Sequence, residues 1–182
     1  PAEVNRAVCD RLAGSGPYAA AWVGGVDVGS DRLTTRAVVG AERGYVDGHD
    51  LATTDDSADP HPAVRAWVDD DVAVADALVG GGPAGDWRRR ALAAGYQSLC
   101  AVPLTYDGVT HGVLVVAAAE PNAFGDRERD VLDGLGRSVG YALAAIERRR
   151  ALETDETVEL EFAGEGVDLE FARLARETDC EL

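Results

Sequence analysis

The stretch that decides the fold is Gly95–Glu120, "GYQSLCAVPLTYDGVTHGVLVVAAAE". Two apolar runs flank Asp107-Gly108, a dipeptide that strongly predicts the turn of a β-hairpin. Because Pro103 cannot donate a ladder hydrogen bond, we expect an edge or a bulge near the end of the first strand. The first run also carries the polar trio Tyr96-Gln97-Ser98 and the thiol of Cys100. The hairpin is therefore a candidate pocket wall as well as a piece of sheet.

Apolar periodicity predicts the elements on either side of the hairpin. Downstream, Asp126 opens a long amphipathic helix whose apolar stripe includes Leu132, Leu135, Val139 and Leu143. The long irregular loop upstream contrasts with the short connections of most domains, and such loops are often functional. In chain order we expect a helix over 2–14, strands over 18–27 and 32–40, a loop over 41–62, a helix over 62–70, a strand over 72–76, a helix over 85–95, the hairpin, and a helix over 126–153.

The composition changes after residue 152. Residues 151–182 hold 11 acidic residues and 2 arginines, a net charge of −9 out of −16 for the chain. "TVELEFAG", residues 157–164, alternates as a half-buried strand does, and the last 15 residues form an amphipathic helical pattern. We predict one domain over residues 1–152 and the truncated beginning of another over 153–182. Since the chain starts at Pro1 and has no methionine, we expect it to be a piece of a longer protein.

Charge is the strongest compositional signal. The chain has 33 acidic residues against 17 basic ones, and every basic residue is arginine. Such a surface repels itself unless salt screens it, and the pattern is typical of proteins from extreme halophiles. A phosphate-binding face needs concentrated Lys and Arg, so this segment is not expected to bind nucleic acid.

The cysteines and histidines give no metal or disulfide pattern. Cys9, Cys100 and Cys180 lie far apart, with neither CxxC nor CxxH spacing, which points to a reducing, cytoplasmic environment. The three histidines are scattered, so we predict no metal site, and the sequence identifies no cofactor. The longest apolar run, Gly112–Ala119, is far shorter than the ~20 residues of a membrane span, so no membrane association is expected.

The order of elements resembles the GAF domain, a small-molecule sensory module related to PAS domains. The residues that carry the resemblance are "AWVGGVD" (21–27), "GYVDG" (44–48), "WRRRALAAGYQSLCAVPL" (87–104) and "GVLVVAAAEPNAFGDRERDVL" (112–132). "ETDETVELEFAG" (153–164) and the acidic composition narrow the similarity to the GAF modules of bacterio-opsin-activator-like helix-turn-helix regulators of halophilic archaea.

The resemblance implies an α+β fold with a central antiparallel sheet, terminal helices on one face, and short helices and loops on the other. The ligand would lie between the sheet and the short-helix layer. Alternation along the first hairpin strand puts Ser98, Cys100 and Val102 on one face, and we expect this more polar face to line the cavity. Carried over by position, the ligand-binding residues are Trp22, Tyr45, His49, Trp67, Trp87, Arg88, Tyr96, Ser98 and Cys100.

Each candidate also has a structural interpretation. Trp67 and Trp87 can be plain core residues of amphipathic helices, and Tyr96 and Ser98 can cap backbone groups at the strand entry. Cys100 can be a small buried apolar residue. Arg88 can either clamp an anionic or carbonyl group of a ligand or face water among the acids.

Three functions remain open. The leading hypothesis is a non-enzymatic sensory domain of a transcription regulator, which binds a small cytosolic molecule and signals through its long C-terminal helix. The alternative is a dimerisation module with a vestigial pocket, pairing through its terminal helices as a homodimer. Some GAF-like proteins reduce free methionine sulfoxide, but no paired cysteines support that reaction here, so we predict no enzyme. DNA binding would belong to a C-terminal domain absent from this chain.

Overall fold

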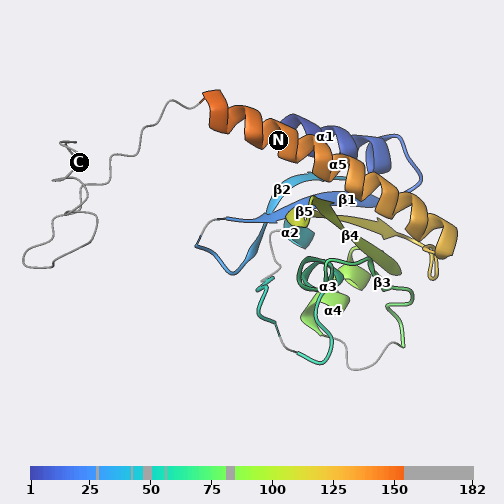
Figure 1. Cartoon of the computed structure of the whole chain (residues 1–182). Coiled ribbons are helices and arrows are strands. Elements are labelled where there is room, and N and C mark those ends of the chain that lie inside the picture. Colours follow the sequence, from blue (N-terminus) through green and yellow to red (C-terminus); the bar gives the residue numbers. More distant parts are fainter. Residues whose placement is uncertain (28, 42, 47–50, 56, 81–84, 154–182) are drawn as a thin grey trace, which may run out of the picture. The chain divides into compact units, whose positions relative to one another are not determined.

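The computed structural model describes residues 1–153 except 28, 42, 47–50, 56 and 81–84 (Figure 1). The predicted second domain therefore lies outside the described residues, apart from Glu153, and the boundary at 152 stays a prediction. The elements in chain order are α1 (Ala2–Cys9), a π-helical turn (Asp10–Gly14), β1 (Ala20–Val26), β2 (Leu33–Val39), α2 (Arg43–Val46), α3 (Pro62–Asp69), β3 (Ala73–Ala75), α4 (Asp86–Ala93), β4 (Ser98–Tyr106), β5 (Val109–Ala118) and α5 (Asp126–Glu153).

Five of the described strands form one antiparallel sheet in the order β2-β1-β5-β4-β3. The β4–β5 hairpin turns at Asp107 (φ 54°) and Gly108 (φ 72°), two positive dihedrals that match the twist of the strands they join. Its pairing shifts between Pro103 and Thr105, so the predicted bulge is confirmed. The hairpin thus lies at the centre of the sheet, not at its edge.

Helices cover both faces of the sheet (Figure 1). Helices α1 and α5 lie on one face, and α3 and α4 lie on the other with the loops that carry them. Each face has its own buried cluster, because alternate residues of β1, β4 and β5 point to opposite sides. The predicted α+β arrangement, with terminal helices on one face and short helices on the other, is confirmed.

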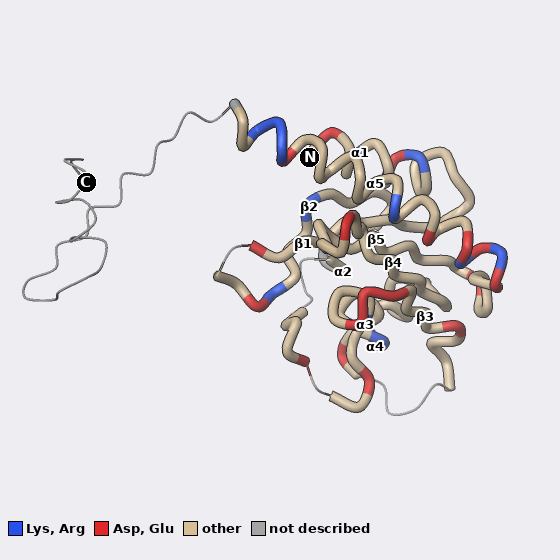
Figure 2. The backbone as a smooth tube through the Cα atoms, viewed as in Figure 1, with Lys and Arg blue, Asp and Glu red and all other residues tan. Residues whose placement is uncertain are grey.

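Charged residues are spread over the helices and loops (Figure 2). The run Arg148–Arg150 lies at the exposed C-terminal end of α5, whereas Asp69–Asp71 begins at the last residue of α3 and continues beyond it. Among the described helices none is long and apolar enough to cross a bilayer. Groups of three or more side chains suited to hold a metal ion are likewise absent from the described part of the chain.

Candidate functional site

Aromatic rings occupy the layer between the sheet and helices α3 and α4. Trp22 comes from β1, His61 precedes α3, and Trp87 lies in the first turn of α4. The His61 ring centroid is 6.0 Å from that of Trp22 and 5.2 Å from that of Trp87. All three side chains are buried. The layer therefore joins three separate segments through one row of rings.

A second ring pair extends this layer. Tyr45 of α2 and Tyr96, just before β4, meet edge to face with their centroids 5.0 Å apart. Both belong to the same buried cluster as Trp22, and Trp67 of α3 packs against it while partly buried. Burial raises the pKa of Tyr45, with a further contribution from Tyr96, so its hydroxyl keeps its proton at neutral pH. This face therefore carries neutral polar groups among apolar rings.

Two ring N–H groups are the chemically distinctive feature of the layer. Nδ1 of His61 accepts a hydrogen bond from the Ala63 amide at 3.0 Å, which caps α3 and places the ring proton on Nε2. Nε1 of Trp22 is fully buried and has no acceptor among the described residues. A buried donor without an acceptor costs about 1–3 kcal/mol. An acceptor atom on a bound molecule would remove that cost.

Arg88 makes its contacts within the protein. Its guanidinium forms a two-point contact with the carboxylate of Asp59, one bond measuring 2.8 Å, and lies 4.6 Å above the Trp87 ring. The indole N–H of Trp87 donates to the backbone oxygen of the same Asp59 at 2.8 Å. The hydrogen bond to Asp59 raises the pKa of Arg88. Arg88 therefore does not face water but ties the 41–62 loop to α4, while its contact with a ligand stays a prediction.

The predicted face of β4 was also wrong. Cys100 and Val102 point away from the aromatic layer and pack with the cluster under α1 and α5. Leu99 and Ala101 face the aromatic layer instead. The hydroxyl of Ser98 donates to the backbone oxygen of Glu120 at 2.7 Å, so it fastens the strand entry as its structural interpretation proposed.

The predicted site residues thus divide into groups. Trp22, Tyr45, Trp67, Trp87 and Tyr96 come together in or against one layer, whereas Cys100 lies on the opposite face. His49 lies outside the described residues. Sequence reasoning missed His61 and Asp59. The signal for His61 was its place before Pro62, since proline at the first helical position favours a capping residue just ahead of it.

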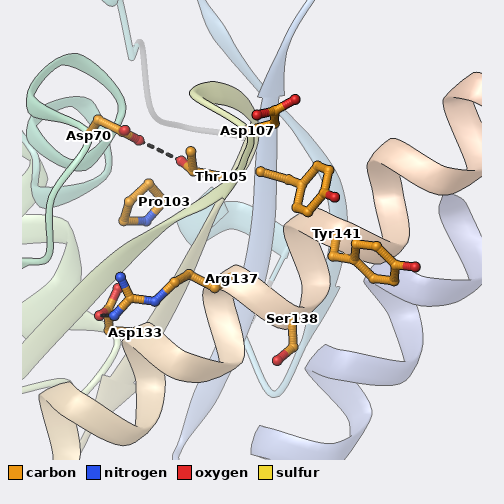
Figure 3. A pocket seen from close by; sticks show the side chains of 9 residues that line it. Asp70, Pro103, Thr105, Asp107, Asp133, Arg137, Ser138 and Tyr141 are labelled. Carbon is orange, nitrogen blue, oxygen red and sulfur yellow. Dashed lines mark hydrogen bonds and ion pairs between the residues drawn. The ribbon is translucent and has the colours of Figure 1, made fainter.

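The opposite face holds a groove beside the hairpin bulge (Figure 3). It has a volume of about 630 Å³ and is bordered by Asp70, Thr105, Asp133, Arg137 and Tyr141, among others. Four of its polar groups are paired with each other: Asp70 accepts from the Thr105 hydroxyl, and Arg137 contacts Asp133. These internal pairs make the groove an ordinary helix–strand junction.

The thiols of the described residues lie under the terminal helices. Cys9 and Cys100 are fully buried, and burial raises the pKa of each to about 12. The reactive form of cysteine is the thiolate, which such burial suppresses at neutral pH. Both side chains behave as small apolar core residues, as the structural interpretation of Cys100 proposed.

Residues 1–144 match the family model described as GAF_2, a GAF domain. The chain is 31% identical over 178 residues to the bacterioopsin transcriptional activator of Halobacterium salinarum, and this match covers 97% of the chain and 25% of that protein. The chain thus spans about a quarter of that relative's length.

Two solved structures show the same fold. The second GAF domain of DevS from Mycobacterium smegmatis superposes with a TM-score of 0.62 at 19% identity, over 84% of this chain and 99% of that one. A type II free methionine-R-sulfoxide reductase from Thermoplasma acidophilum gives a TM-score of 0.61 at 16% identity, over 79% and 92% of the two chains. At these identities the likeness concerns the fold alone.

Proposed function

The chain belongs to the GAF domain family, and from that premise we propose that it is a non-enzymatic sensory module of a transcription regulator. In this proposal a small cytosolic molecule binds in the layer between the sheet and helices α3 and α4. The observation that carries it is the buried Trp22 indole N–H, which has no acceptor among the described residues. The name of the Halobacterium relative supports the regulatory context.

The ligand proposed is a molecule with an acceptor group and an apolar body. The acceptor would bond Trp22 Nε1, beside the ring of His61. Rings already occupy this layer, so binding requires them to shift. The Asp59–Arg88 contact would control such a shift. It holds the covering loop to α4 through side chains, so the loop could move when this contact breaks.

The signal would pass through the strands that both faces share. Leu99 and Ala101 of β4 face the aromatic layer. The alternate residues Cys100 and Val102 point the other way and pack toward α5. A displacement of β4 by a ligand therefore changes the surface on which α5 rests. This is a population shift between two packings, and its size equals the ligand's differential affinity for them.

Catalysis is not part of the proposal. The described thiols are buried and protonated at neutral pH, which is the opposite of what a reductase of the thiol type needs. DNA contact is not assigned to this chain either, because its net charge of −16 repels phosphate. DNA binding would belong to another part of the regulator.

The test uses intrinsic tryptophan fluorescence. The chain has three tryptophans, and Trp22, Trp67 and Trp87 all lie in or against the aromatic layer. Cyclic GMP, citrate and benzoate, which represent cyclic nucleotides, organic acids and aromatic metabolites, are titrated in multimolar KCl. A saturable change that Trp22→Phe abolishes and Trp87→Phe preserves supports the proposal. Equal binding by both variants, or no response to any probe, contradicts it.

A second candidate function is homodimerisation through α5. Val131, Tyr141 and Leu152 expose between 57% and 88% of their surface on that helix. Leu143, by contrast, is 3% exposed and belongs to the domain's own core, so it is unsuited to test an interface. Light scattering of the wild type and of Tyr141→Asp distinguishes the two cases. A dimer that the substitution splits favours this function, and a monomer in both forms removes it.

A further inference from the structure

A second cavity lies on the face of the sheet that α1 and α5 cover, opposite the aromatic layer. It has a volume of about 380 Å³, and its lining comes from Pro1, α1, the end of β1, the middle of β2, the start of β5, and α5. This volume falls within the range of small-molecule sites. Leu143 supplies apolar surface, while Asn5, Arg36, Glu147 and Arg150 supply polar groups of both signs.

Arg36 reaches this cavity because of a bulge in β2. Val23 of β1 pairs with Ala37 and Gly24 pairs with Thr35, so Arg36 is an extra residue without an opposite partner in that ladder. Bulges redirect side chains and are common beside functional sites. The redirected Arg36 passes over Gly25, where a Cβ atom would come within 3.1 Å of its Nε. Glycine at this position therefore leaves the room that the guanidinium occupies.

The guanidinium of Arg36 is held by one residue and keeps further hydrogen-bond donors available. One of its terminal nitrogens donates to Asp27 at 2.6 Å. A guanidinium carries five N–H donors, so this contact fixes its position and leaves donor capacity for an anion. Asp27 thus acts as a positioning residue for Arg36.

Asn5 of α1 brings an unsatisfied group to the same cavity. Its side chain is 5% exposed, and its Oδ1 accepts no hydrogen bond from any described residue. An unsatisfied buried amide is rare in folded proteins and calls for an explanation. A donor group on a bound molecule explains it.

Helix α5 supplies charges on the far wall. Oε2 of Glu147 lies 2.8 Å from Nδ1 of His111, and this contact holds the carboxylate against the sheet. Arg150 lies one turn further along the same helix and also lines the cavity. The cavity therefore presents Arg36 to an anion, and a carboxylate and an amide oxygen to a cation.

We propose that this cavity binds a small zwitterion of the amino-acid class. Its carboxylate would pair with Arg36, and its ammonium would donate to Asn5 Oδ1 beside Glu147. A simple anion would leave Asn5 Oδ1 without a donor, and a simple amine would leave the remaining donors of Arg36 to solvent. The bound molecule would join α1, the sheet and α5, and would bias α5 from the side opposite the aromatic layer, independently of the function proposed above.

Three matched probes test the charge requirement on the complete 182-residue chain in multimolar KCl. L-Alanine carries both groups, propionate lacks the ammonium, and ethylammonium lacks the carboxylate. Binding is followed by NMR shifts of the Asn5 side-chain amide, and tryptophan fluorescence is recorded in parallel. The expected result is saturable binding of L-alanine, weaker binding of both other probes, and unchanged fluorescence.

Two variants locate the binding. Arg36→Gln removes the positive charge. We expect it to weaken the binding of L-alanine roughly tenfold, because one charge-assisted contact is lost. Arg137→Gln, on the other groove of the same face, is expected to bind like the wild type. Glu147→Gln provides a second disabling change if Arg36→Gln perturbs the fold. No saturable shift with L-alanine, equal binding of all three probes, or unaltered binding by both disabling variants overturns the proposal.

Discussion

The two faces of one sheet are packed by different means. Under α1 and α5 the largest fully buried side chains are aliphatic or phenyl, such as Leu104, Leu114, Leu132 and Phe124. Under α3 and α4 the same strands meet Trp, Tyr and His rings that carry polar atoms. The core cluster under α1 and α5 is therefore mainly aliphatic, whereas the cluster under α3 and α4 combines rings with specific hydrogen bonds.

Backbone proximity adds to this difference. A Cβ atom on Gly140 of α5 would lie 2.6 Å from the backbone oxygen of Thr105, and one on Gly136 would lie 2.7 Å from that of Pro103. The helix thus rests directly on β4 at the bulge. On the other face the covering loop is held by side chains, chiefly Asp59 and Arg88. In the function proposed above, the α5 side would be the fixed output side and the side of α3 and α4 the adjustable input side.

The largest expected effect is on the fixed side. Gly140→Ala forces α5 away from β4, because its new methyl group meets backbone that cannot rotate aside. We expect a loss of about 3 kcal/mol in the free energy of unfolding, measured with urea in KCl. Gly134→Ala is the control, since open space surrounds its Cβ, and it is expected to gain up to about 1 kcal/mol from helix propensity. Equal effects of the two substitutions would disprove the close contact.

The next effect tests the adjustable side. Asp59→Ala leaves the guanidinium of Arg88, 11% exposed, without its carboxylate. We expect a cost of about 2 kcal/mol, typical of a largely buried charge that loses its partner. Proteolysis within the 41–62 loop should also become faster.

The matched control is an ion pair on the side of the sheet that α1 and α5 cover. Asp10→Ala removes the exposed helical pair with Arg6, in which both side chains are more than half exposed. Exposed pairs contribute about 0–1 kcal/mol, and multimolar salt screens them further. If Asp59→Ala costs no more than this control, the loop is not held by the Arg88 contact.

The hairpin shows how far the sequence predicts this structure. Asp107-Gly108 and Pro103 predicted the turn and the bulge, because each residue acts through its own backbone chemistry. The inward face of β4 was not predictable in the same way. Both faces of a central strand are buried, so polarity does not distinguish them, and the polar Ser98 is satisfied by the Glu120 backbone.

Long-range pairs were equally hidden from the sequence. Arg88 and Asp59 are separated by 29 positions, and nothing local indicates that they meet. The spacing of Gly136 and Gly140, four residues apart on one helix face, was a usable signal for close backbone approach. Its partner strand could not be named from sequence.

A smaller effect depends on pH. Burial raises the pKa of the Cys100 thiol from 9.0 to about 12, so the folded protein holds a proton that the unfolded chain releases. Its contribution to stability is complete below pH 9 and is lost as pH rises from 9 toward 12. At about pH 10 the loss is on the order of 1 kcal/mol for this one thiol.

Urea unfolding at about pH 8 and about pH 10 measures the slope of the free energy of unfolding against pH. Cys100→Ala should reduce it, while the slope from Cys9, whose pKa is raised in the same way, remains. Comparing slopes removes the constant cost of the small cavity that alanine leaves. An unchanged slope would mean that the Cys100 thiol is accessible to water, and the apolar character of the α5 side would then be overstated.

The smallest effect separates two buried tryptophans of the aromatic layer. Trp87 Nε1 donates to the backbone oxygen of Asp59 at 2.8 Å, whereas Trp22 Nε1 has no acceptor among the described residues. Phenylalanine at either position removes the N–H together with part of the ring. Trp87→Phe also breaks a hydrogen bond, so we expect it to cost about 1 kcal/mol more than Trp22→Phe in the absence of added molecules.

A molecule that bonds Trp22 is expected to narrow this difference in stability between the two variants. The wild type and Trp87→Phe then gain stability from the bound molecule, while Trp22→Phe does not, so the difference between the variants shrinks as the concentration rises. Chemical unfolding of the two variants, with and without the probe that changes the fluorescence, measures the difference directly. Equal losses without any probe would mean that Trp22 already has an acceptor in the folded protein, and the adjustable face would lose its vacant donor.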